Sequence, residues 1–406
     1  MSGRGTTGER ALDEMNDAVS TDRIAEEVHR TLEHVRGMRD EFVDVLGKLC
    51  SIESPTDHPE TQSSVHALLG PAFEDLGYDV RIVRGRVGGD HFLAAPRSRR
   101  RGAPMQLLVG HTDTVWPLAT LERMPVKEID GRLYGPGTLD MKGGLTQMIF
   151  ALRALRDLGY EPEVTPVVFV NSDEEVGSPD STRHVRRLAR RVQRALILEP
   201  AMGPDGWIKT ARKGVGRFEI AVRGRAAHAG LDPEAGASAI LELSHVIQQL
   251  NAMNDSERGT TVNVGLVEGG TRPNVIAAQA HATVDVRVTT IQNGQAIEER
   301  ILALEPTTPG VTLEVTGEMQ VAPLERTPRN RSLWERARAI GADLGFQLEE
   351  TMVGGGSDGN TTSLFTATLD GLGCIGDGAH ADHEHIVIGP SLDRCALLAR
   401  LMLAPA

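Results

Sequence analysis

Short apolar runs alternate with polar, glycine-rich segments along the first half of the chain. Three of these runs are rich in Val, Ile and Leu, which is typical of parallel strands buried on both faces: 107–109, 167–170 and 195–198. A histidine or an acidic residue follows each run. Because the carboxyl ends of parallel strands meet at one edge of an open α/β sheet, we expect these polar side chains to gather there, where ligands bind.

Apolar residues at helical spacing predict helices around these strands. The expected ranges are about 22–51 (one or two helices), 61–76, 143–158, 180–193, 332–344 and 391–403. Further strands are expected at 78–83 and 91–95, and the Asp130-Gly131 turn predicts a hairpin over 129–134. The pattern predicts an α/β domain with a mixed, mainly parallel central sheet. Residues 1 to about 20 are polar and are expected to fray.

The pattern changes at about Gly214. Alternating strands and two amphipathic helices follow, at 217–222, 236–250, 260–267, 280–288, 295–304 and 311–315. They predict a self-contained α+β (ferredoxin-like) unit with antiparallel strands and both helices on one side. We therefore predict a catalytic, metal-binding domain formed by 1–214 and 326–406, and an inserted domain at 215–325.

Composition narrows the class of protein. The 406 residues are enough for two domains, and the formal net charge of −13 disfavours nucleic acid as a partner. The short basic run Arg97–Arg101 is interpreted as a solvated turn. Three cysteines are too few for a disulfide framework and favour a reducing, cytoplasmic compartment. The polar N-terminus shows no signal peptide, and no apolar run reaches the roughly 20 residues of a membrane helix.

Metal-ligating residue types gather at the expected strand ends and in glycine-rich loops: His111, Asp140, Glu175, Glu199 and His380. Such side chains suit a catalytic zinc site, and a pair of ions needs a bridging carboxylate. Asp140 is the best candidate bridge, because the glycines of its loop (135–144) allow close backbone approach. Spacing alone does not decide which histidine near the end of the chain is the ligand, because His383 and His385 are alternatives to His380.

Two further acids near these ligands have expected roles. Asp113, two residues after His111, can accept a hydrogen bond from the other imidazole nitrogen and orient the ring. Glu174, next to Glu175, would serve as general base toward the attacking water and then pass the proton to the leaving amine. Taken singly, each acid is more simply a solvated loop residue or a helix cap, and Asp173 keeps that interpretation. For the other candidates the functional interpretation is favoured, because they are expected to lie together at one edge of the sheet.

The segments that carry these candidate residues, taken together and in chain order, resemble those of a family of di-zinc peptidases. That family includes aminoacylase, a folate-cleaving glutamate carboxypeptidase, succinyl-diaminopimelate desuccinylase and acetylornithine deacetylase. The matching segments, from about residue 40 to the end, are His111-Thr112-Asp113, Gly137–Gly144, Glu174-Glu175, Glu199 and His380. The resemblance implies two zinc ions per subunit, for which cobalt or manganese could substitute. It implies that Asp140 bridges them, with His111 and Glu199 on one ion and Glu175 and His380 on the other. It also implies a cis peptide bond between Asp140 and Met141.

The inserted unit resembles the family's lid and dimerisation domain, which implies a homodimer. In the relatives, a loop histidine of this domain reaches the partner's active site and binds the developing oxyanion, and His228 matches it. Arg287 and Asn274 match positions that bind the substrate's free carboxylate. The alternative for Arg287 is an exposed strand residue paired with a neighbouring acid. The glycine-rich loop 354–360, with Gly356 and Ser357, is a further candidate to contact substrate.

These expectations combine into a metal-dependent hydrolase of glutamate-carboxypeptidase type. It would cleave an amide or peptide bond next to a C-terminal carboxylate-bearing amino acid, in a short peptide or N-acyl amino acid. One alternative is an N-acyl amino acid deacylase or desuccinylase of the same fold. Another is a metal-binding protein without catalysis, against which the intact Glu174 argues. The sequence does not identify the acyl group or the released amino acid.

Overall fold

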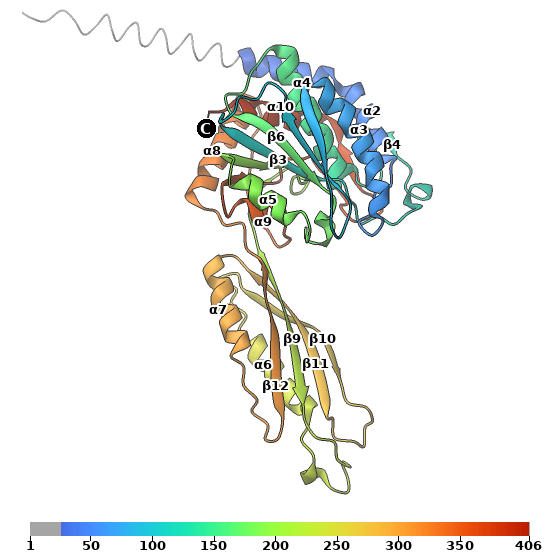
Figure 1. Ribbon diagram of the computed structural model, residues 1–406, viewed down its shortest axis with the longest axis vertical. Helices are drawn as coiled ribbons and strands as arrows, with labels where there is room; N and C mark the ends of the chain where they lie inside the picture. The colour runs from blue at the N-terminus through green and yellow to red at the C-terminus, as the bar shows by residue number, and fades with distance from the viewer. Residues whose placement is uncertain (1–25, 406) are drawn as a thin grey trace, which may run out of the picture. The chain divides into compact units, whose positions relative to one another are not determined.

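A computed structural model describes residues 26–405, so the expected fraying of the first residues and the helix start near residue 22 lie outside it. The chain folds as two compact units (Figure 1). One comprises the chain up to Lys209, Thr327–Thr351 and the chain from Phe365 onward. The other comprises Thr210–Arg326 and Met352–Leu364. We describe each unit by itself.

The first unit is built on a six-stranded sheet in the order β1-β2-β6-β3-β7-β14. Its strands are β1 (Tyr78–Val83), β2 (His91–Pro96), β3 (Met105–His111), β6 (Thr165–Asn171), β7 (Arg194–Ile197) and β14 (Ala367–Leu369). Strands β6, β3, β7 and β14 run parallel, whereas β2 pairs antiparallel with both β1 and β6. The predicted mixed, mainly parallel sheet is confirmed.

Helices cover both faces of this sheet, which explains the continuous apolar runs of its central strands (Figure 1). One face packs on five helices: α2 (Arg39–Cys50), α3 (Gln62–Asp75), α4 (Gly143–Leu158), α8 (Pro328–Asp343) and α10 (Ile388–Leu403). Leu108 of β3 and Val168 of β6 belong to this core. The next residues along these strands, Val109 and Phe169, face α5 (Thr182–Ala189) on the other side.

A small sheet in the order β15-β16-β5-β4 joins two distant loops. Strands β4 (Lys127–Ile129) and β5 (Arg132–Tyr134) form the predicted hairpin, with positive φ at Asp130 and Gly131 in its turn. Strand β16 (His385–Val387) pairs with both β5 and β15 (Gly376–Asp377). This pairing brings the 378–384 loop beside the 135–144 loop.

The second unit has the predicted α+β architecture. Its chain order is β9 (Gly214–Arg223), α6 (Ala239–Asn251), β10 (Thr261–Gly269), β11 (Gln279–Val288), α7 (Ile291–Leu302) and β12 (Thr312–Val321). The sheet order is β10-β11-β9-β12, and all neighbouring strands are antiparallel. Both helices pack on one face, where Leu243 and Ile297 meet Ile220 and Val284 in a separate core. This is the ferredoxin-like β-α-β-β-α-β pattern.

A segment later in the chain, separated from the rest by residues 327–351, also belongs to the second unit. This segment, 352–364, contains α9 (Asp358–Thr362), and Asn360 Nδ2 donates to the carbonyls of Lys213 and Ala322 at 3.2 and 2.8 Å. The boundaries expected for the inserted domain, and its lid and dimerisation roles, stay predictions. Within residues 26–405, no helix is both long and apolar enough to cross a bilayer.

Candidate metal centre and hydrolytic site

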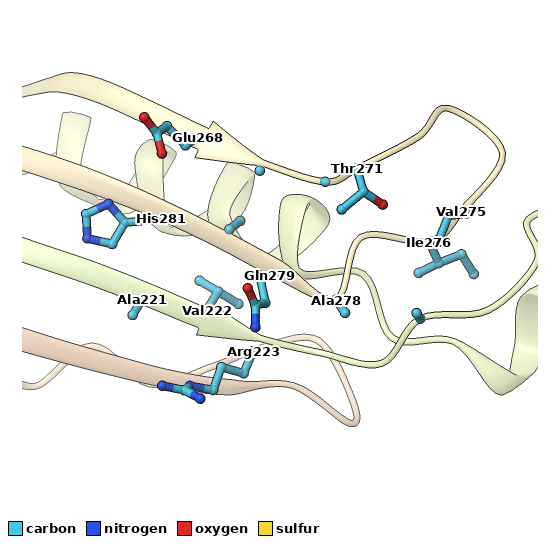
Figure 2. Close-up of a pocket in the computed structure, with 14 residues that line it drawn as sticks. Ala221, Val222, Arg223, Glu268, Thr271, Val275, Ile276, Ala278, Gln279 and His281 are labelled. Carbon is cyan, nitrogen blue, oxygen red and sulfur yellow. The ribbon is translucent and has the colours of Figure 1, made fainter.

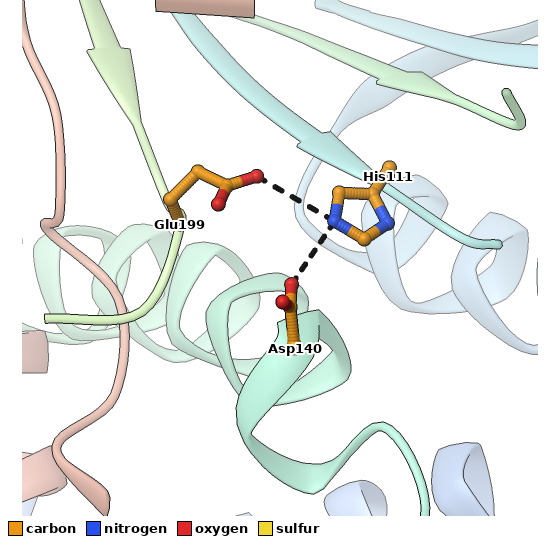
Figure 3. A group of neighbouring side chains, drawn as sticks. All are labelled: His111, Asp140 and Glu199. Carbon is orange, nitrogen blue, oxygen red and sulfur yellow. Dashed lines mark hydrogen bonds and ion pairs between the residues drawn. The ribbon is translucent and has the colours of Figure 1, made fainter. Parts of the chain in front are cut away.

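Three potential ligands converge where the central parallel strands end. His111 is the last residue of β3, and Glu199 lies two residues beyond the neighbouring β7. His111 Nε2 lies 3.2 Å from Asp140 Oδ1 and 3.5 Å from Glu199 Oε1 (Figure 3). One ligand atom from each of the three residues lies within 4.8 Å of the others, close enough to share one cation.

A second group of ligands adjoins the first through Asp140. His380 Nε2 lies 3.4 Å from Asp140 Oδ2 and 3.3 Å from Glu175 Oε2. Asp140 therefore presents one carboxylate oxygen to each histidine, as a bridging ligand between two ions would. The structure brings all five expected ligands together, and their assignment to particular ions stays a prediction.

The local backbone explains how Asp140 reaches this position. Gly137, with a φ of +72°, turns the chain just before Asp140, and the expected cis peptide bond between Asp140 and Met141 is present. Helix α4 starts directly afterwards. A Cβ atom on Gly144 would lie 2.2 Å from the Leu198 carbonyl oxygen, so only glycine lets the helix start against the segment that carries Glu199.

The donor set fits two divalent cations. Imidazole nitrogens and carboxylate oxygens are the ligands of catalytic zinc, and here they sit in two groups with one shared carboxylate. Glu175 Oε1 is buried and has no hydrogen-bond partner within residues 26–405. A buried carboxylate oxygen without a partner is costly, and a cation would satisfy it.

The two groups differ in access to solvent. The His111 side chain is 1% exposed, whereas that of His380 is 50% exposed. His380 also adopts a φ of +61°, a left-handed conformation that is uncommon for a non-glycine residue and tends to occur at functional sites. Substrate would therefore approach from the side of His380.

The histidines and carboxylates of the two groups shift one another's pKa values. Burial would lower the pKa of His111, but Asp113, Asp140 and Glu199 hold that pKa well above its usual value. Hydrogen bonds to Asp140 and Glu175 raise the pKa of His380 to about 10. Burial would raise the pKa of Asp140, yet His111 and His380 keep it well below its usual value. The surrounding carboxylates thus favour the imidazolium form of both histidines.

We expect metal uptake to release protons, because an imidazole must be neutral to bind a cation. The raised pKa of both His111 and His380 favours their protonated forms, so up to two protons should leave on uptake, and affinity should rise with pH. The His380 contribution to stability of the metal-free protein is complete below pH 6.5 and is lost as pH rises through about 10. Calorimetric zinc titrations in buffers of different ionisation enthalpy count these protons. Uptake without proton release would contradict the expectation.

Asp113 contacts both the His111 ring and the acidic pair. The shortest contact of His111 Nδ1 is with the main-chain oxygen of Asp113, at 2.9 Å, and the carboxylate lies 3.5 Å away. That carboxylate also accepts from the backbone N–H groups of Glu174 and Glu175, at 3.3 and 3.2 Å. Asp113 is thus placed to hold the Glu174-Glu175 backbone as well as to orient the ring.

Glu384 has a structural role that the sequence did not reveal. Its side chain is buried, and its carboxylate accepts hydrogen bonds from Trp116 Nε1 and from the backbone of Gly137, Leu139 and Asp140, at 2.7–3.0 Å. It thereby ties the loops after β3, before α4 and before β16 together around the bridging aspartate. Its distance of four residues from His380 was the available signal, but that spacing does not indicate a partner.

We expect Glu384→Ala to destabilise the protein by about 3 kcal/mol or more, because four buried donors would lose their acceptor. Glu384→Gln keeps one acceptor oxygen and should cost clearly less. Denaturant unfolding of both variants, with Glu74→Ala on the exposed face of α3 as the control, measures this difference. Equal stability of the Ala variant and the control would show that the hydrogen bonds contribute nothing.

The expected carboxylate-binding residues lie in the second unit. Arg287 Nε and Nη2 donate to the two carboxylate oxygens of Asp285 at 2.8 and 3.0 Å, so the alternative of a local acid partner is realised. Arg287 Nη1 lies 3.4 Å from the carbonyl oxygen of Gly354. The neighbouring Gly356 carbonyl accepts from Arg212, and the Ser357 hydroxyl caps α9 by accepting from Gly359.

His228 and Asn274 lie on adjacent loops of the second unit. The backbone N–H of Ala229 donates to the Asn274 carbonyl at 3.0 Å. His228 is exposed, and its Nδ1 accepts from the backbone of Gly230 and Leu231, which leaves Nε2 as the protonated nitrogen of the neutral ring. A cavity of about 540 Å³ adjoins these loops, with Glu268, Gln279 and His281 projecting from the strands (Figure 2).

An α/β fold with two acid–histidine groups sharing one carboxylate defines a metal-dependent hydrolase. Residues 107–404 match the model of Peptidase family M20/M25/M40, and the chain belongs to that family. It is 28% identical over 370 residues to Carboxypeptidase G2 of Pseudomonas sp. (strain RS-16), covering 89% of this chain and 88% of the relative. The resemblance predicted from the sequence motifs is confirmed.

Solved structures show the same fold. Aminopeptidase PepT from Bacillus cereus superposes with a TM-score of 0.75 at 22% identity, over 90% of this chain and 98% of that one. The YXEP protein of Bacillus subtilis, described as a dinuclear metal-binding peptidase, superposes with a TM-score of 0.68 at 17% identity, over 91% and 98%. The family match, rather than these structural similarities, shows that the chain is a hydrolytic enzyme of a metallopeptidase family.

Proposed function

We propose that this enzyme cleaves an amide bond next to a C-terminal, carboxylate-bearing amino acid, with glutamate as the first candidate. The observation that carries the proposal is the shared carboxylate of Asp140, within reach of His111 on one side and His380 on the other. The similarity to a relative named Carboxypeptidase G2 favours a carboxypeptidase over other hydrolases.

His111, Asp140 and Glu199 would hold one ion, and Asp140, Glu175 and His380 the other. Bound there, zinc ions would acidify water and polarise the scissile carbonyl. Glu174, next to a ligand and oriented through Asp113, accepts the proton of the attacking water and transfers it to the nitrogen of the leaving amine as the C–N bond breaks. The N–H at Nε2 of His228 is a suitable donor for the developing oxyanion.

Arg287 would bind the free carboxylate of the substrate, because a guanidinium group holds a carboxylate bidentately. Its present bidentate partner is Asp285, so the substrate carboxylate would have to displace or share that contact. The proposal therefore predicts that an amidated or esterified end makes a poor substrate.

We also propose a cytoplasmic homodimer that contains zinc. Four exposed apolar side chains of the second unit support self-association: Ile240, Leu241, Leu266 and Val267. The last two lie on β10, an edge strand of its sheet, which is open to further pairing. The three cysteines are free and buried, as suits a reducing compartment. A monomeric mass in sedimentation at micromolar concentration would refute the dimer.

A substrate panel tests the activity. N-acyl and N-aminoacyl glutamates, their α-amides, and N-acyl derivatives of other amino acids should be compared after chelation, with and without added zinc. We expect zinc-restored release of free glutamate, and little cleavage of the amides. Hydrolysis confined to other N-acyl amino acids would move the enzyme to the deacylase alternative. The absence of any hydrolysis with two ions bound would overturn the proposal.

A further inference from the structure

A cavity of about 350 Å³ opens on the α5 face of the central sheet, lined by four arginines: Arg81, Arg97, Arg99 and Arg191. They come from β1, from the loop after β2 and from the residues after α5. Met105 and Val167, at the starts of β3 and β6, also line the cavity. The candidate metal ligands follow the opposite ends of these strands, so the cavity is separate from the hydrolytic site.

The positive charge of this cavity is poorly balanced. Asp79 is the one acid among the residues lining the cavity, and Arg97 Nε donates to it at 3.3 Å. Within residues 26–405, Arg81, Arg99 and Arg191 have no carboxylate within 4.0 Å. Three guanidinium groups without a carboxylate partner thus surround one hollow in a chain whose formal net charge is −13, and one of them, Arg99, donates from Nη1 to the Met105 sulfur at 3.0 Å. Such a concentration of charge attracts anions.

The floor of the cavity is apolar. It is formed by Leu93 of β2, Val167 of β6 and Leu188 near the end of α5. The volume is that of a small-molecule site, and an apolar surface with a few convergent polar groups is the usual composition of such sites. A fitting ligand carries two or more closely spaced negative charges beside an apolar portion.

We propose that this arginine cavity is a second ligand site, and that it takes a phosphate-bearing small molecule. Arginine pairs bidentately with phosphate oxygens, and a diphosphate provides enough charge for three guanidinium groups in a compact volume. The basic run at 97–101, expected to be a solvated turn, thereby divides into two kinds of residue. All are exposed, but Arg97 and Arg99 line the cavity, whereas Arg101 does not.

The proposal is tested by titrating the purified, metal-loaded enzyme with pyrophosphate and with ADP in low-salt buffer, by calorimetry. We expect saturable binding of one ligand per chain. Arg81→Gln and Arg191→Gln should each weaken binding by about tenfold or more, because a hydrogen bond to a charged group is lost. Arg101→Gln, at an exposed arginine of the same loop, should leave the affinity within about twofold. Tighter binding of ADP than of pyrophosphate would identify a nucleotide, and equal affinity a phosphate group alone.

The variants also separate the cavity from the metal centre, because pyrophosphate binds metal ions as well. Binding that persists unchanged in Arg81→Gln and Arg191→Gln would belong to the metals and would overturn the proposal. The proposal would also be overturned if no saturable binding occurred, or if Arg101→Gln weakened binding as strongly as Arg81→Gln and Arg191→Gln. All three arginines are exposed, so the variants should fold and retain hydrolytic activity. The outcome does not depend on which substrate the enzyme cleaves.

Discussion

Replacing Glu174 with Gln should lower kcat by about a thousandfold, within the range that a positioned general base contributes. Gln keeps the size of the side chain but cannot accept a proton from water at neutral pH. Glu174 belongs to neither ligand group, and its backbone N–H is held by Asp113, so the metal content should be unchanged. Steady-state kinetics together with metal analysis by mass spectrometry measure both quantities.

The matched control for this change is Glu122→Gln, which alters an exposed acid of the same unit and should leave kcat at the wild-type value. Turnover of Glu174→Gln close to that of the control would refute the role of general base. Loss of activity together with loss of metal would instead place Glu174 among the ligands.

Replacing Asp140 with Asn should weaken binding of both ions, by more than about a hundredfold, since even partners outside the ligand shell cost ten- to hundredfold. The change removes the negative charge that His111 and His380 share, and it leaves one oxygen where two are needed. The pKa of each histidine should then fall toward its usual value, because both are raised in part by Asp140. Metal content after dialysis and the histidine titrations by NMR are the measurements.

An exposed aspartate at the end of α8 supplies the control: Asp343→Asn should retain both ions. A site in which Asp140→Asn lost one ion and kept the other at full affinity would show that Asp140 is not shared. Retention of both ions would remove the bridging role altogether.

Much of the fold and of the candidate metal centre could be predicted from local patterns. Apolar runs such as 167–170 identify buried strands, and chain order places the residues after them at one edge of the sheet. Gly159 ends α4 in a left-handed conformation directly after the predicted helix range 143–158, as a glycine at this position commonly does. These features depend on the identity of neighbouring residues, which the sequence displays directly.

The features that were missed depend on contacts between distant residues. Glu384 accepts from Trp116, 268 positions away, and the sequence gives no measure of such a contact. Likewise, the Asp285–Arg287 pair was only an alternative, because alternate residues of a strand face the same side whether or not they bind each other. Helix α7 begins at Ile291, earlier than expected, because the Thr290 side chain caps it by accepting from Asn293.

The path of the chain between the two units has a consequence for evolution and for protein engineering. The chain passes from one unit to the other after Lys209, Arg326, Thr351 and Leu364, whereas a simple insertion would need two such passages. Excising 215–325 would therefore leave α9 behind without the Ala322 carbonyl that Asn360 binds. The second unit therefore cannot be removed as one continuous segment. A chimera between relatives would have to exchange 352–364 together with it, and substitutions in these two stretches should be inherited as a set.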